Sequence, residues 1–486
     1  MTIKDLKPTA VWTIFDEITK VPRPSKKEEK IRKYILDFAK ANGIDAKTDE
    51  VGNVVLSKPA TPGKEDAPTV IMQGHMDMVC ESNKKDFDFD NSPITTIIDG
   101  EWVHADNTTL GADNGIGVAA SLAVMADKSL VHGPLEALFT VDEETGMTGA
   151  NNLGENMMNG SILLNLDSED DGQFFIGCAG GIDTTITFDY KREMAPADYH
   201  WFDIELANLS GGHSGGDIHE GRANSNKLLA RFLFGLSQKH DIVLSEIRGG
   251  NLRNAIPRAA HAVVGVHTSK KEEVVVAFNE FVADVKNEYS HTDPAMDITI
   301  ATADKPEYAI DSDTTLRLIR SLYACPHGVI SMSHDLEGLV ETSTNLASVK
   351  MQPDNTILVT TSQRSSVESR KYDIANQIEA LFLMAGAKVT HGDGYPGWAP
   401  NMNSAIMKIA ADTYKELYGE EPLITAIHAG LECGLFLTKY PHLDMVSFGP
   451  TLRGVHSPSE KMHIPAVERF WDQLVTILRK VSDLKK

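Results

Sequence analysis

Four short apolar runs stand out along the chain, and each has the length of a buried strand. They cover residues 69–73, 135–141, 162–166 and 445–448. Uninterrupted apolar runs of this length are typical of strands covered on both faces, as in a parallel sheet. Acidic or histidine residues follow each run, so we expect polar side chains to gather at one edge of the sheet.

Helical periodicity occurs between these runs. Residues 27–41 place Ile31 and Ile35 on one face and charged residues on the other, which predicts an amphipathic surface helix. Residues 115–127 begin with glycines and continue with small and apolar residues, as expected of a helix packed closely on a sheet. This alternation of helices and strands favours an α/β fold with a largely parallel sheet.

The middle of the chain has a different pattern of predicted strands and helices. Beyond the glycine-rich residues 177–181, alternating strands and single helices predict an α+β region over residues 186–395. Residues 393–400 are rich in glycine, proline and aromatic residues, which often mark a domain boundary. We therefore expect residues 1–185 and 396–486 to form one domain, with 186–395 inserted into it.

Composition restricts the partners that we expect. Of 486 residues, 42% are hydrophobic and 24% are charged, as in an ordinary folded protein. Lys and Arg number 46 against 69 Asp and Glu, and the net charge of −23 argues against nucleic acid and anionic membranes as partners. Divalent cations are more compatible with this charge.

Sequence patterns also favour a cytoplasmic setting. No segment supplies the 18 consecutive apolar residues of a membrane span, and the N-terminal residues lack the apolar core of a secretory signal. The four cysteines lie far apart without a C-x-x-C motif, so a disulfide framework is not expected. We predict a soluble protein in a reducing compartment.

Two short motifs carry candidate metal chemistry. In Gly74-His75-Met76-Asp77, an imidazole and a carboxylate two residues apart point to the same side of an extended chain, so one can bind a metal ion while the other orients it. Alone, this motif is more often a surface pair. Asp113 lies among glycines before the predicted helix and could bridge two metal ions, or simply cap the helix.

Three further groups follow the remaining apolar runs. In Asp142-Glu143-Glu144, adjacent acids can face different ways, so one can bind a metal ion while its neighbour acts as a general base; a solvated acidic turn is the alternative. Asp167 and His456 follow the other two runs. Crevices of open α/β sheets form at this edge, and two histidines with several carboxylates match a catalytic zinc-type site.

Two other kinds of protein compete with this interpretation. Ser214 lies in Gly212-His213-Ser214-Gly215-Gly216, which satisfies the G-x-S-x-G pattern of a serine hydrolase. That hypothesis leaves the polar residues after the apolar runs without a purpose. A non-catalytic metal-binding protein is the second alternative, but structural zinc sites are usually closed and rich in cysteine.

Beyond these motifs, the whole chain resembles a known family. The similar motifs are GHMDMV (74–79), TTLGADNGIG (108–117), DEETGM (142–147), LNLDSE (164–169), GGHSGGDIHEGRANSNK (211–227), LRNAIPR (252–258), AGLECGLF (429–436) and GPTLRGVHSP (449–458). They resemble those of the co-catalytic zinc metallopeptidases, which include aminoacylases, carboxypeptidases and dipeptidases, and most narrowly those of the aminoacyl-histidine dipeptidases. The resemblance implies a zinc-binding α/β domain, with a mixed, mostly parallel sheet flanked by helices, and an inserted α+β lid that mediates homodimerisation.

The resemblance also implies a ligand set for two divalent ions, with zinc favoured and cobalt or manganese compatible. His75 and Asp167 would hold one ion, Glu144 and His456 the other, and Asp113 would bridge them through a site that includes a cis Asp113–Asn114 bond. Asp77 would support His75. Glu143 would be the general base that takes a proton from a metal-bridging water.

The implied substrates are dipeptides, including those that end in histidine. By resemblance, His219 of the lid would stabilise the oxyanion, acting within one chain or across a dimer. Arg364 would bind the substrate carboxylate with help from Asn254, and Glu432 would meet the free amine. A tripeptidase, deacylase or carboxypeptidase of the same family is the alternative.

Overall fold

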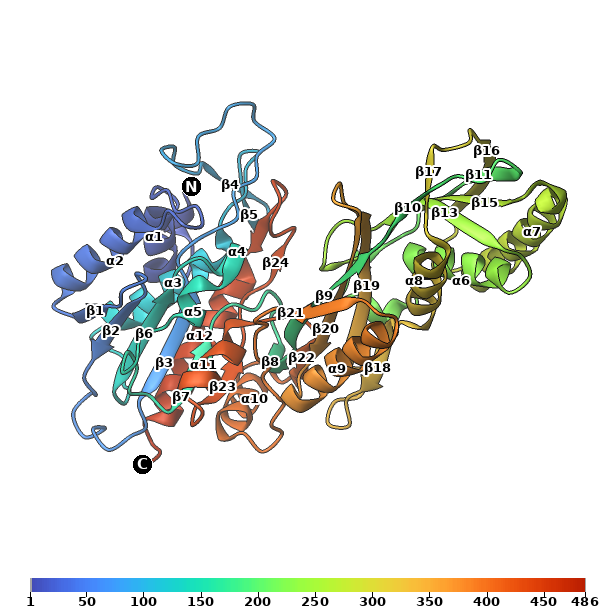
Figure 1. Cartoon of the computed structure of the whole chain (residues 1–486). Coiled ribbons are helices and arrows are strands. Elements are labelled where there is room, and N and C mark those ends of the chain that lie inside the picture. The colour runs from blue at the N-terminus through green and yellow to red at the C-terminus, as the bar shows by residue number, and fades with distance from the viewer. Residues whose placement is uncertain (1, 486) are drawn as a thin grey trace. The chain divides into compact units, whose positions relative to one another are not determined.

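The computed structural model describes residues 2–485, which divide into two compact units (Figure 1). The first unit comprises the chain up to Gly177, together with Pro400–Ala426 and the segment from Leu431 onward. The second comprises Cys178–Ala399 and Ile427–Gly430. It begins ahead of residue 186 because strand β9 (Gly180–Asp189) already belongs to its sheet.

An eight-stranded mixed sheet forms the centre of the first unit, in the order β1-β2-β6-β3-β7-β23-β8-β22. The four predicted apolar runs are its neighbouring parallel strands β6, β3, β7 and β23, which confirms the expectation of buried strands. Antiparallel pairing of β1 with β2, of β2 with β6 and of β23 with β8 makes the sheet mixed. The bounds are β1 Asp45–Thr48, β2 Val54–Lys58, β3 Val70–His75, β6 Leu135–Thr140, β7 Ile162–Asn165, β8 Gln173–Cys178, β22 Leu423–Ile427 and β23 Asp444–Ser447.

Most helices of the first unit pack against this sheet or against one another. The predicted helix over 27–41 is α2, which buries Ile31 and Ile35 as expected. The glycine-led helix is α3, which contacts β3 and the N-terminal helix α1. The bounds are α1 Thr9–Ile18, α2 Glu29–Asn42, α3 Ala112–Ala126, α4 Glu143–Gly146, α5 Thr148–Asn151, α10 Ala405–Tyr418, α11 Glu432–Lys439 and α12 Ile464–Val481, with a 3-10 turn η1 at Ile3–Asp5.

A small antiparallel sheet accompanies the large one, in the order β24-β25-β5-β4. Its strands are β4 Thr96–Asp99, β5 Trp102–Ala105, β24 Leu452–Arg453 and β25 Lys461–His463. β24 and β25 form a hairpin, and β25 pairs with β5. This sheet therefore brings the loop that contains His456 close to the segment that leads into α3.

The second unit contains a nine-stranded sheet made of two halves with the same topology. One half runs β11-α6-β13-β15-α7-β16 along the chain, with strand order β16-β11-β15-β13. The other runs β9-α8-β19-β20-α9-β21, with order β21-β9-β20-β19. Each half is a β-α-β-β-α-β motif with antiparallel neighbours, and β13 pairs with β19 between the halves. The first half is inserted between β9 and α8 of the second.

The four helices of this unit share one hydrophobic core with the sheet, so they cover the same face. The bounds are β11 Tyr199–Ala207, α6 Ser225–Ser237, β13 Ile242–Gly249, β15 Ala260–His267, α7 Lys271–Glu288, β16 Asp297–Ala303, α8 Ser312–Ala324, β19 Val340–Met351, β20 Thr356–Ser365, α9 Glu368–Met384 and β21 Lys388–His391. Shorter elements are β10 Arg192–Met194, β12 Gly212–His213, β14 Ala255–Ile256, β17 Tyr308–Ile310, β18 Gly328–Met332, and the 3-10 turns η2 Ile218–Glu220 and η3 Thr268–Lys270. Within residues 2–485, no helix is long and apolar enough to span a membrane.

Candidate metal centre

The carboxyl ends of three neighbouring parallel strands place polar side chains at one edge of the large sheet. β3 ends at His75, β6 is followed by α4, which begins with Glu143 and Glu144, and β7 is followed by Asp167. Because parallel strands end at the same edge, residues far apart in the sequence meet there.

Four predicted ligands come together around the fifth, Asp113, which presents its two oxygens to two different histidines. Nε2 of His75 lies 3.0 Å from Oδ1 of Asp113 and 3.3 Å from Oδ1 of Asp167. Nε2 of His456 lies 3.1 Å from Oδ2 of Asp113 and 3.0 Å from Oε2 of Glu144. Two of the three candidate ligand groups, His75-Asp113-Asp167 and Asp113-Glu144-His456, thus share one carboxylate, which is an arrangement able to hold two cations; the third is His75-Glu143-Glu144.

The charges of this cluster fit divalent cations. Four acids, Asp113, Glu143, Glu144 and Asp167, face only two imidazoles. Oε1 of Glu144 is buried and accepts no hydrogen bond from any described residue. Buried carboxylates are costly without a positive partner, so the donor set and the excess negative charge both suit metal binding.

The pKa values of the chain without metal reflect the same crowding. Burial raises the pKa of Asp167 to about 7. Burial and the charges of nearby carboxylates raise the pKa of Glu143 well above its usual range. The hydrogen bonds to Asp113 and Glu144 raise the pKa of His456 to about 11. Without metal ions, these groups therefore hold protons more tightly, and the protons offset part of the negative charge that bound cations would balance.

Asp77 holds both His75 and the start of α4. Its Oδ1 lies 3.3 Å from Nδ1 of His75, and it accepts hydrogen bonds from the amides of Glu143 and Glu144 at 3.0 and 3.2 Å. The hydroxyl of Ser25 donates at 2.7 Å to Oδ2, the oxygen that also accepts the amide of Glu144. Burial opposes ionisation, but the contacts with His75 and Ser25 lower the pKa of Asp77 to about 2. An ionised Asp77 fixes the orientation of the imidazole, as expected of a supporting carboxylate.

Asp113 does not cap α3, so that alternative interpretation is wrong. The cap residue is Gly111, and Asp113 and Asn114 have non-helical backbone angles on either side of a cis peptide bond. The carboxylate that accepts the amides at the start of α3 belongs to Glu460. Asp113 also does not directly follow a strand of the large sheet, since β5 of the small sheet precedes it. Sequence reasoning missed Glu460, although its place four residues after His456 gave a signal.

Glu432 lies in the first turn of α11 and is 2% exposed. One oxygen accepts hydrogen bonds from Nε2 of Gln73 at 2.7 Å and Oγ1 of Thr140 at 2.9 Å, whereas Oε1 has no hydrogen-bond partner among the described residues. Burial raises the pKa of Glu432 to about 8. This acid belongs to the same unit as the metal cluster, and its charge influences both His75 and Glu143.

The remaining predicted residues belong to the second unit. Arg364 on β20 is 7% exposed, donates from Nη1 to the hydroxyl of Tyr395 at 2.8 Å, and has an Nε without a hydrogen-bond partner among the described residues. His219 is half exposed on η2, 3.4 Å from Glu220. Asn254 is exposed just before β14, and its carbonyl accepts the amide of Ser214.

The surroundings of Ser214 do not support a serine nucleophile. Its hydroxyl is buried and, within the described part of the chain, has no hydrogen-bond partner that could act as a base. The adjacent His213 instead accepts the amides of Gly215 and Gly216 through Nδ1. A catalytic triad requires a base in contact with the nucleophile, and Ser214 has none among the described residues. The G-x-S-x-G match therefore belongs to a turn and does not mark a nucleophile.

The fold and the cluster define a class of metal-binding hydrolase, and comparison with known proteins agrees. Residues 71–480 match peptidase family M20/M25/M40, and the chain belongs to this family.

Two relatives match over almost the whole length. The chain is 43% identical to the cytosol non-specific dipeptidase of Escherichia coli (strain K12) over 480 residues, which is 99% of each protein. It is 44% identical to the crystal structure of aminoacylhistidine dipeptidase from Vibrio alginolyticus, with a TM-score of 0.94 over 100% of this chain and 99% of that one. The resemblance predicted from the motifs is confirmed. A tripeptidase structure from Staphylococcus aureus, at 16% identity and a TM-score of 0.58 over 99% of this chain and 100% of that one, shares the fold.

Proposed function

We propose that the protein is a metal-dependent dipeptidase that hydrolyses the peptide bond of dipeptides, including those with a C-terminal histidine. The observation that carries this proposal is the shared carboxylate of Asp113, whose two oxygens face His75 and His456. Full-length similarity to a cytosol non-specific dipeptidase and to an aminoacylhistidine dipeptidase supports the substrate class.

Two divalent ions would complete the site, held as the resemblance implies. His75 and Asp167 would bind one, His456 and Glu144 the other, and Asp113 both. When bound, such ions lower the pKa of a shared water and polarise the substrate carbonyl. Nitrogen and oxygen ligands suit zinc, cobalt and manganese alike, and we propose zinc as the resident metal.

Glu143 is proposed as the group that moves the proton. It lies beside the ligand Glu144 at the start of α4, whose amides are fixed by Asp77. A carboxylate with a raised pKa can take a proton from the attacking water and deliver it to the leaving amine. Asp77 would act through His75 rather than on the substrate.

Substrate contacts are proposed from side chains with unused hydrogen-bonding capacity. The unpartnered Nε of Arg364 suits a substrate carboxylate, with Asn254 assisting. The unpartnered Oε1 of Glu432 suits the free amine. As the resemblance implies, His219 would donate to the oxyanion. These assignments make the first unit the catalytic domain and the second unit the lid.

A cytoplasmic location and a homodimer through the lid complete the proposal. The name of the cytosolic relative supports the location. A partner lid would have to use a surface other than β13 and β19, which already pair with each other. Light scattering after gel filtration would give about twice 53.1 kDa for the dimer, and 53.1 kDa would exclude it.

A metal-dependent substrate panel tests the proposed activity. Protein stripped with a chelator is reloaded with zinc, cobalt or manganese and offered dipeptides, tripeptides and N-acyl amino acids. We expect hydrolysis of dipeptides, including alanyl-histidine, only after reloading. Intact dipeptides with cleaved tripeptides or N-acyl amino acids would assign the protein to another activity of its family.

A further inference from the structure

The segment that positions Asp113 is held from one side by a buried carboxylate. Glu460, which is 2% exposed, accepts the amides of Leu110 at 2.7 Å, Gly111 at 3.0 Å, Ala112 at 2.8 Å and Asp113 at 3.3 Å. Both of its oxygens are used, each by two consecutive amides. Because four consecutive amides donate to this one side chain, the segment has little freedom to move.

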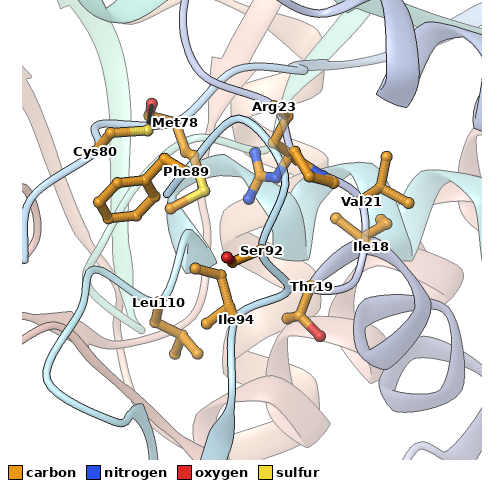
Figure 2. A pocket seen from close by; sticks show the side chains of 11 residues that line it. Ile18, Thr19, Val21, Arg23, Met78, Cys80, Phe89, Ser92, Ile94 and Leu110 are labelled. Atoms are coloured by element: carbon orange, nitrogen blue, oxygen red, sulfur yellow. Dashed lines mark hydrogen bonds between the residues drawn. The ribbon is translucent and has the colours of Figure 1, made fainter. Parts of the chain in front are cut away.

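A buried arginine holds the same segment and also the turn after His75. Arg23, which is 3% exposed, donates to the carbonyls of Met76 at 3.0 Å and Asp77 at 2.7 Å, and also to that of Gly111. Arg23, Met78 and Leu110 line the same small pocket, which Figure 2 shows from close by. Gly111 has φ +69°, and a Cβ there would lie 2.5 Å from Nη2 of Arg23. Glycine is therefore required for this close contact.

Glu460 also belongs to the loop that carries His456. Both residues lie in the hairpin loop between β24 and β25, and β25 pairs with β5, from which the chain continues to Asp113. Within the loop, the amide of Glu460 donates to the carbonyl of Ser457 at 3.0 Å. The carboxylate of Glu460 thus joins the loop that carries His456 to the backbone of Asp113.

We propose that Glu460 and Arg23 are positioning residues of the metal centre, which fix Asp113 against His456 and His75 respectively. This inference rests on the ligand set given under Proposed function. All the hydrogen bonds of these two side chains within the described residues go to the backbone, so we assign them a supporting role and not that of ligands. Their effect is to fix the orientation of the Asp113 carboxylate before any ion binds, with one oxygen toward His75 and the other toward His456.

The test compares two buried glutamates of the same unit. Glu136→Gln is the matched control: Glu136 is 3% exposed and accepts the amides of Asn159 at 2.9 Å and Gly160 at 3.1 Å, but it lies near the opposite end of β6. Glu460→Gln keeps the shape of the side chain and replaces one acceptor oxygen by a donor. Metal-free proteins are titrated with zinc against a chromogenic chelator, and with cobalt while the visible absorption spectrum is recorded.

We expect Glu460→Gln to bind metal about 10- to 100-fold more weakly and to shift the cobalt absorption bands, because such supporting groups orient the ligands. Glu136→Gln should keep the affinity and spectrum of the wild type even if it unfolds more easily. Arg23→Lys should follow Glu460→Gln, since an ammonium cannot reproduce the planar fork of donors. Arg23→Lys and Glu460→Asp decide the question if Glu460→Gln does not fold.

Wild-type affinity and spectra in Glu460→Gln and Arg23→Lys would overturn the positioning role and leave the ligand set intact. Equal losses in Glu460→Gln and Glu136→Gln would also overturn it, since the effect would then be general destabilisation. A wild-type protein that binds no metal would instead reject the ligand set itself.

Discussion

At the scale of single residues, neighbouring carboxylates differ in what they contact. Asp77 accepts hydrogen bonds from two amides and from Ser25, and its pKa is lowered to about 2. Glu143 is crowded by other acids, and burial raises its pKa. Asp77 is thus ionised at neutral pH and suited to orienting a histidine, whereas Glu143 holds a proton more tightly, as suits a group that takes one from water.

Glu143→Gln should separate metal binding from hydrolysis. The amide keeps the size of the side chain but cannot take a proton from water, so we expect kcat for dipeptides to fall by about 10²- to 10⁴-fold. Two metal ions per chain should remain, as measured by elemental analysis. Glu144→Gln is the comparison and should lose metal. Loss of metal in Glu143→Gln would make Glu143 a ligand, and unchanged kcat would assign the proton transfer to another group.

His428 predicts a pH dependence of stability that does not involve the metal centre. This side chain is 6% exposed, and its Nε2 lies 2.7 Å from the hydroxyl of Ser343. Burial, assisted by the charge of Arg364, lowers the pKa of His428 to about 3. Unfolded, the group would titrate near its ordinary 6.5, so below that pH the unfolded chain binds a proton that the folded chain does not. The contribution of His428 to the free energy of unfolding is therefore fully present above pH 6.5, and it is lost progressively as the pH falls toward 3.

Metal-free wild type and His428→Gln are compared by urea unfolding at pH 7.5 and 4.5. At about 1.36 kcal/mol per pKa unit, the wild type should lose about 2–3 kcal/mol more than the variant between these values. Metal-free protein is used for both, so that the titration of the metal ligands cancels in the difference. Equal losses in the two proteins would show that His428 does not stay neutral in the folded chain.

At the scale of elements, α3 packs unusually close to β3. A Cβ on Gly74 of β3 would lie 2.1 Å from Oδ1 of Asn114, and one on Gly117 of α3 would lie 2.5 Å from the same oxygen. Nδ2 of Asn114 donates to the carbonyl of Leu166 at 2.6 Å, which joins the helix start to the end of β7. The glycines of the sequence motif therefore allow the residue after Asp113 to be buried between helix and sheet.

Gly117→Ala should destabilise the first unit. The added methyl would lie 2.7 Å from the carbonyl oxygen of Leu166, and neither backbone can move aside easily. Overpacking of this kind typically costs about 1–3 kcal/mol. Gly235→Ala on α6 is the control, because no atom lies within 4 Å of its Cβ, and alanine in a helix should stabilise by about 0.5–1 kcal/mol. Urea unfolding measures both, and equal stability of the two variants would contradict the close packing of α3.

At the scale of the whole molecule, sequence patterns predicted the first unit better than the second. The apolar runs before His75 and Asp167 identified parallel strands because burial on both faces leaves a continuous pattern. The matching halves of the second unit gave no such signal, since the sequence contains no detectable repeat and one half interrupts the other between β9 and α8. Two halves of a domain can keep the same topology after their sequences have diverged. The repeat is then visible in the strand order and not in the sequence.

The candidate ligands and the supporting Asp77 were predictable for a related reason, whereas Glu460 and Arg23 were not. Carboxylates and histidines after apolar runs are visible in the sequence, as Glu144 and Asp167 show. Glu460 accepts hydrogen bonds from backbone amides, and Arg23 donates to backbone carbonyls. The type of a residue does not show which backbone groups it will contact in the fold. The sequence therefore indicated the side chains that face the site more readily than those that hold its loops.

Metal removal should weaken the first unit alone. His75 and His456 stand near opposite ends of the chain, yet both meet Asp113 within that unit, so ions bound there would stabilise only its folded state. At a free metal concentration of 100 times Kd, binding contributes about 2.7 kcal/mol per site.

Thermal unfolding followed by calorimetry should show one transition that moves to lower temperature with a chelator and one that does not. His456→Ala should reduce the shift, whereas His267→Ala, at an exposed position of the second unit, should retain it. Identical melting curves with zinc and with chelator would mean that these ligands do not hold metal in the folded chain.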